Sequence, residues 1–105
     1  MAFAIWEGRS VTEKILDESE VMRQACEKWG IPSQIVLAIE EMSELTKELC
    51  KDLRDRPNLD HIAEEIADVE ITVGALVNIY GCANEVEAWK RKKIKRLADR
   101  IASEP

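Results

Sequence analysis

Apolar residues recur every three or four positions over most of the chain, which is the spacing of one face of an α-helix. Gly30, Pro57 and Gly81 interrupt this pattern and divide it into segments. No alternating pattern typical of a β-strand is found. We therefore predict an all-α protein with four helices, over residues 10–29, 33–54, 59–80 and 85–101. Short connections between long helices favour antiparallel neighbours in a four-helix bundle.

Two of the predicted helices begin with a capping-box pattern, in which a side chain at the start of the helix is followed three residues later by a glutamate. These pairs are Ser10 with Glu13 and Asn84 with Glu87. Asn58 is predicted to cap the third helix. Residues 1–9 have no clear period and are interpreted as an N-terminal arm ahead of one domain, residues 10–105.

The later half of the third helix, residues 71–80, is apolar around much of its circumference, which predicts a central, buried helix. Gly74 within it suggests the close approach of another backbone. Leu37 and Ile71 lie outside the main apolar stripes of their helices, which favours an oligomer with a second surface to bury. The fourth helix is expected to bury Val86, Ile94, Leu97 and Ile101.

The charge of the chain is unevenly distributed. The formal net charge is −6, yet residues 90–100 hold seven lysines and arginines and a single acid. An acidic body with one basic helix argues against a protein that coats nucleic acid. The three cysteines have no CxxC spacing, which argues against a disulfide framework or a zinc site. With no apolar run long enough for a membrane span, we expect a cytoplasmic protein with reduced thiols.

Two pairs of acids carry the clearest chemical signal. Glu41 and Glu44, and likewise Glu65 and Asp68, lie one helical turn apart at the edge of an apolar stripe. If the second and third helices are antiparallel neighbours, these four carboxylates converge and repel one another, so a cation is expected between them. Oxygen ligands without histidine or cysteine favour Mg²⁺, with Mn²⁺ as a substitute. Because Mg²⁺ commonly takes further ligands from phosphates, a phosphate ester or phosphoanhydride is the expected substrate.

The motif Glu40-Glu41-x-x-Glu44, followed by Glu65-x-x-Asp68, resembles the EExxE…ExxD signature of the MazG-like all-α nucleoside triphosphate pyrophosphohydrolases. The resemblance covers roughly residues 29–100. It implies a MazG-like helical bundle that works as a dimer or tetramer, and Mg²⁺-dependent cleavage of an NTP or dNTP to the monophosphate and pyrophosphate. A role in clearing surplus or damaged nucleotides follows from the same resemblance. It also implies that the metal ligands are Glu41, Glu44, Glu65 and Asp68.

The catalytic residues expected from this resemblance are the same four acids together with Glu40. Either Glu40 or Glu44 would act as the general base, since one carboxylate not fully engaged by metal is needed for that role.

Lys93 and Arg96 follow Trp89 at spacings that place all three on one stripe of the fourth helix. We expect this stripe to bind the triphosphate, with Lys93 as the leading candidate because MazG-like proteins have a lysine near this point. Many relatives that bind deoxynucleotides have an asparagine after it, whereas this chain has Arg96-Leu97. His61 has no ExxH partner, which argues against a di-iron site and favours a capping or surface role.

Two alternatives remain open from the sequence. The chain could be a phosphoribosyl-ATP pyrophosphohydrolase, although Leu37-Ala38-Ile39 does not resemble the Lys- and Gly-containing approach to the motif in that subfamily. It could also be a non-catalytic, oligomeric helical binding module.

Overall fold

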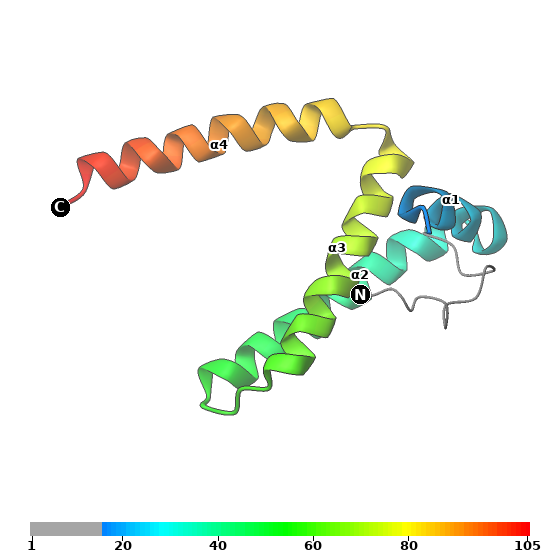
Figure 1. Cartoon of the computed structure of the whole chain (residues 1–105), viewed down its shortest axis with the longest axis horizontal. Helices are drawn as coiled ribbons and strands as arrows, with labels where there is room; N and C mark the ends of the chain where they lie inside the picture. The colour runs from blue at the N-terminus through cyan, green and yellow to red at the C-terminus, as the bar shows by residue number, and fades with distance from the viewer. Residues whose placement is uncertain (1–15) are drawn as a thin grey trace, which may run out of the picture.

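The computed structural model describes residues 16–105, and all regular secondary structure in that range is helical (Figure 1). The predicted all-α class is therefore confirmed for this part of the chain. The predicted arm, residues 1–9, and the Ser10 capping box lie outside the described residues. The four helices are α1 (Glu18–Trp29), α2 (Ile31–Leu53), α3 (Leu59–Tyr80) and α4 (Ala83–Ser103).

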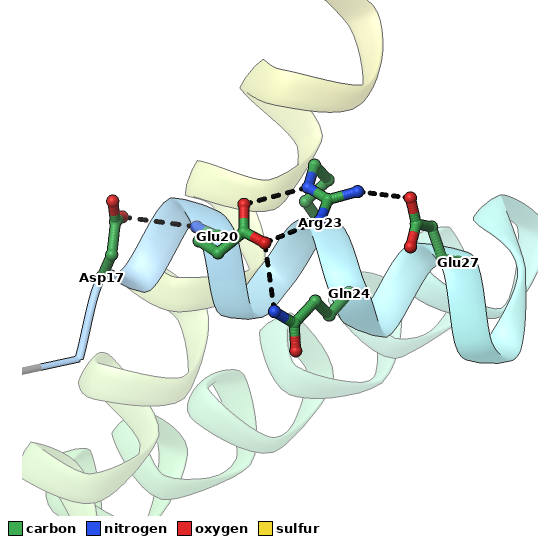
Figure 2. A network of polar contacts seen from close by, with 5 residues as sticks. All are labelled: Asp17, Glu20, Arg23, Gln24 and Glu27. Atoms are coloured by element: carbon green, nitrogen blue, oxygen red, sulfur yellow. Dashed lines mark hydrogen bonds and ion pairs between the residues drawn. The ribbon is translucent and has the colours of Figure 1, made fainter. Parts of the chain in front are cut away.

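The start of α1 differs from the prediction. Leu16 and Asp17 are not helical, and the Asp17 side chain accepts a hydrogen bond from the backbone N–H of Glu20 at 3.3 Å. The prediction of one uninterrupted helix over residues 10–29 is therefore wrong at this point, because Asp17 satisfies an N–H group that a preceding turn would otherwise bond. Figure 2 shows this cap beside the polar network of α1.

Gly30 separates α1 from α2. Its φ of 90° lies in a region that side chains with a Cβ rarely adopt, and its N–H bonds to the carbonyl of Cys26 at 2.8 Å. The chain enters α2 immediately afterwards, two residues earlier than predicted. Pro32 lies in the first turn of α2, where its missing N–H would have no helical partner.

The boundaries of α3 agree with the prediction. The Asn58 side chain accepts a hydrogen bond from the N–H of His61 at 3.1 Å, which confirms the predicted cap. Gly81 ends the helix in the left-handed conformation, with φ 60°. The capping box predicted for α4 is wrong, because Cys82 occupies the N-cap position and Asn84 already lies in the first turn.

The interface between α2 and α3 forms the core of the described structure, and the two helices run antiparallel as predicted (Figure 1). Ala38 and Ala75 are 1% and 3% exposed, and these small side chains let the two helices approach closely. Gln34 and Thr72 are buried in the same interface. α1 packs against both helices at the end where α2 begins.

The prediction of a fully buried α3 is only partly correct. Thr72 and Ala75 are buried, but Ile71, Val73 and Tyr80 are exposed within the single chain. A Cβ at Gly74 would meet a side-chain oxygen of Glu18 at 3.6 Å, so the expected approach of another backbone is not found.

α4 projects away from the other three helices and contacts only α3, next to their connection (Figure 1). Ile94, Leu97 and Ile101 are 65%, 48% and 70% exposed. The predicted burial of these residues is wrong for the single chain, and α4 does not complete a four-helix bundle within it. The turn at Gly81 and Cys82 directs α4 outward, so the described chain extends over 56 × 36 × 28 Å. None of the helices described here is long and apolar enough to span a membrane.

Candidate metal centre

Three acids meet across the interface of α2 and α3. Glu41 lies on α2, and Glu65 and Asp68 lie one turn apart on α3. A carboxylate oxygen from each residue lies within 4.8 Å of the others. All three side chains are half-buried. The antiparallel pairing of the helices accounts for this meeting, because it sets the middle of α2 against the first half of α3.

The electrostatics of this cluster disfavour ionised carboxylates. Burial raises the pKa of Glu41 above its ordinary value, and the charges of Asp68 and Glu44 add to the effect. The pKa of Glu65 is raised by burial first and then by Asp68 and Glu41. The neighbouring groups that add to both shifts are all acids, and no cation among the described residues offsets them.

One oxygen of the cluster stands out. Oε2 of Glu65 is buried and has no hydrogen-bond partner among the described residues. A buried carboxylate oxygen without a donor is costly, because it loses its hydration and gains nothing in return. Such an atom, beside two further carboxylates, fits a hard divalent cation, which binds oxygen ligands. Glu41, Glu65 and Asp68 are therefore the residues that could hold a metal ion.

The other two predicted acids lie beside this cluster. Glu44 is exposed and does not belong to the group of three, although its charge raises the pKa of both Glu41 and Glu65. Glu40 is also exposed, and its charge adds to the shift in the pKa of Glu41. The structure thus brings together three of the four predicted metal ligands and leaves the fourth facing solvent nearby.

The predicted substrate-binding residues are elsewhere. Trp89, Lys93 and Arg96 lie on α4, which makes no contact with α2 in the described structure. The ammonium group of Lys93 lies 5.9 Å from the centre of the Trp89 ring, so these two residues do share one side of the helix. Within one chain, however, the stripe and the acids do not form a common site.

A second polar cluster was not anticipated from the sequence. Glu48 is buried, and its carboxylate pairs with Lys51 at 3.2 Å and faces Nδ1 of His61 at 4.0 Å. The sequence spacing could have predicted this pair. Glu48 follows Glu41 by two helical turns and His61 precedes Glu65 by one turn, so each residue lies on the same face of its helix as the acidic cluster. The His61 side chain is largely exposed, in agreement with the predicted surface role.

The chain matches no protein-family model, no curated protein and no solved structure. The functional assignment therefore depends on the acid motifs and on the geometry of the residues described above.

Proposed function

We propose that this protein is a Mg²⁺-dependent nucleoside triphosphate pyrophosphohydrolase that converts an NTP or dNTP to the monophosphate and pyrophosphate. The observation that carries the proposal is the cluster of Glu41, Glu65 and Asp68, whose oxygens lie within 4.8 Å of one another. The buried Oε2 of Glu65, which has no hydrogen-bond partner among the described residues, supports it, because a bound cation would supply the partner that this atom lacks. The acid motif that resembles the MazG-like enzymes contains all three residues.

Each acid has a part in this proposal. Glu41, Glu65 and Asp68 would hold the metal, and Mg²⁺ when bound there would neutralise charge on the phosphates and lower the pKa of a water molecule. Glu44 is exposed beside the cluster, so its carboxylate is free to accept the proton of the attacking water as general base. Glu40 is the alternative base, since it is exposed on the same helix.

A second copy of the chain completes the site in this proposal. α4 carries Lys93, Arg96 and Trp89, and its apolar residues Leu97 and Ile101 are left exposed in the single chain. Exposed apolar surface of this kind is typical of a subunit interface. Basic α4 and the acidic cluster are complementary in charge, so α4 of one subunit would cover the cluster of its partner and bring these cations to the phosphates.

The test is a release assay on purified protein with a panel of NTPs and dNTPs in Mg²⁺, which measures pyrophosphate separately from orthophosphate. We expect pyrophosphate and the monophosphate, and a loss of turnover of at least about 100-fold in Glu41→Gln, since even residues that only orient a ligand contribute about 10- to 100-fold. Glu70→Gln is the matched control, because Glu70 is an exposed acid of α3 outside the cluster.

The outcomes separate the candidate functions. If pyrophosphate is released from phosphoribosyl-ATP but from no NTP or dNTP, the protein is instead a phosphoribosyl-ATP pyrophosphohydrolase. A folded protein that turns over none of these substrates in saturating Mg²⁺ would reject catalysis and leave a binding module.

A further inference from the structure

A concave pocket lies at the end of the α2–α3 hairpin, with a volume of about 720 Å³. Three cationic side chains line it: Lys51 from the last turn of α2, and Arg54 and Arg56 from the connection to α3. His61 and the buried Glu48 complete the charged lining. The cations outnumber the acid, in a chain whose net charge is negative.

The acid in this pocket is already compensated. Glu48 pairs with Lys51 at 3.2 Å and faces His61 at 4.0 Å. The ion pairs found within residues 16–105 involve neither Arg54 nor Arg56. Asp52, Asp55 and Asp60 belong to the same segment but do not line the pocket. The two guanidinium groups are therefore the charges left to interact with a ligand, and guanidinium groups bind phosphate oxygens in pairs of hydrogen bonds.

The pocket also lies in line with the acidic cluster. Glu48 follows Glu41 by two turns on one face of α2, a rise of about 10 Å. On α3, His61 precedes Glu65 by one turn on the same face. The interface of α2 and α3 thus presents the acidic cluster first and Glu48 with His61 next, and Lys51, Arg54 and Arg56 lie beyond them at the end of the hairpin.

We propose that this pocket binds the pyrophosphate portion of the substrate, through Arg54 and Arg56, with Lys51 as a supporting charge. The proposal rests on the proposed function for the identity of the ligand. The proposal requires the two arginine side chains to extend from the hairpin toward the acids, so that the metal-binding and phosphate-binding groups would hold opposite ends of one polyphosphate. This assigns to the hairpin a share of the role that the sequence suggested for Lys93 and Arg96.

The experiment is a calorimetric titration of the full chain with inorganic pyrophosphate, without divalent metal and at fixed ionic strength. We expect binding by the wild type, weakened at least about tenfold in the double variant Arg54→Gln/Arg56→Gln, because two charge-assisted contacts are removed. The control Arg91→Gln/Lys95→Gln removes the same charge from α4, outside the pocket, and should change the affinity less than about twofold. If the double variant does not fold, Lys51→Gln is the replacement, with an affinity loss in the same direction.

The proposal that this pocket binds pyrophosphate is rejected if the wild type does not bind pyrophosphate, or if both double variants lose affinity equally. Failure of the proposed function looks different. Pyrophosphate binding that depends on Arg54 and Arg56, in a protein that hydrolyses no nucleotide, supports the pocket and rejects the pyrophosphohydrolase activity. Glu41→Gln, which lies outside the pocket, should keep metal-free pyrophosphate binding while losing turnover.

Discussion

Glu41 of α2 and Asp68 of α3 bring carboxylate oxygens within 4.8 Å of each other across the helix interface. Among the neighbouring charges, Asp68 contributes most to the raised pKa of Glu41 and also to the raised pKa of Glu65. The metal-free fold therefore contains an uncompensated repulsion where its two longest helices meet. This repulsion makes the cluster testable through stability as well as through activity.

The first prediction concerns pH in the absence of metal. The folded-state pKa of both Glu41 and Glu65 is raised above 4.5, so between that value and the raised pKa the folded chain holds protons that the unfolded chain has lost. The free energy of unfolding therefore falls as pH rises through this window. We expect Glu65→Gln, which cannot ionise, to be more stable than the wild type at pH 7 and to have no such advantage at pH 4.

Urea denaturation in a chelator at both pH values measures this difference. An equal change in stability at the two pH values would contradict the prediction, because it would show that packing rather than charge is responsible.

The second prediction concerns metal. Mg²⁺ at about 100 times its dissociation constant should stabilise the wild type by about 2.7 kcal/mol, since it binds the folded state. Glu41→Gln should lose this gain, whereas Glu70→Gln should keep it, because Glu70 is exposed and lies outside the cluster. Thermal unfolding with and without Mg²⁺ reports the effect. Equal stabilisation of all three proteins would indicate general screening of charge rather than a site.

The third prediction concerns the exposed face of α4. We expect the wild type to associate in solution and Leu97→Glu to weaken that association at least about tenfold, because a charge would be buried without a partner. Ala88→Glu is the control, since Ala88 is exposed on the opposite side of the helix. Sedimentation over a range of concentrations measures both variants. If the wild type remains monomeric, the proposal that α4 of a second subunit completes the site is rejected.

The fourth prediction concerns the start of α1. Asp17→Ala removes the side chain that caps the helix at the N–H of Glu20, and should lower the free energy of unfolding by about 1 kcal/mol. Ser19→Ala, an exposed change in the first turn, is the control. Urea unfolding compares the two, and a loss of equal size in both would show that the cap is not the cause.

The polar network on α1 adds a pH dependence to this helix (Figure 2). Hydrogen bonds from Arg23 and Gln24 lower the pKa of Glu20 to about 2, and Arg23 also pairs with Glu27. A carboxyl with a lowered pKa contributes stability above its unfolded value of 4.5 and loses it as pH falls toward 2. The contribution is small, because these groups are exposed and screened by solvent.

The helices of this protein could be predicted from local signals. Gly30, Asn58 and Gly81 mark boundaries because a left-handed turn or a side-chain cap acts within a few residues of the chain. The error at α4 is also local. Cys82 occupies the N-cap position, without a side-chain hydrogen bond, where the sequence offered the more familiar Asn84, and the choice between neighbouring positions depends on how the chain enters the helix.

The sequence by itself also determined which acids share a face of each helix, since the periodicity of an α-helix places residues three apart on one side. Only the tertiary structure decided which of them meet. The antiparallel register of α2 and α3 brings Glu41 against Glu65 and Asp68 and leaves Glu44 in solvent, and the same register sets Glu48 opposite His61. The direction of α4 was likewise decided by the turn at Gly81 and Cys82, because the apolar stripe of a helix specifies that it needs a partner but not which surface supplies one.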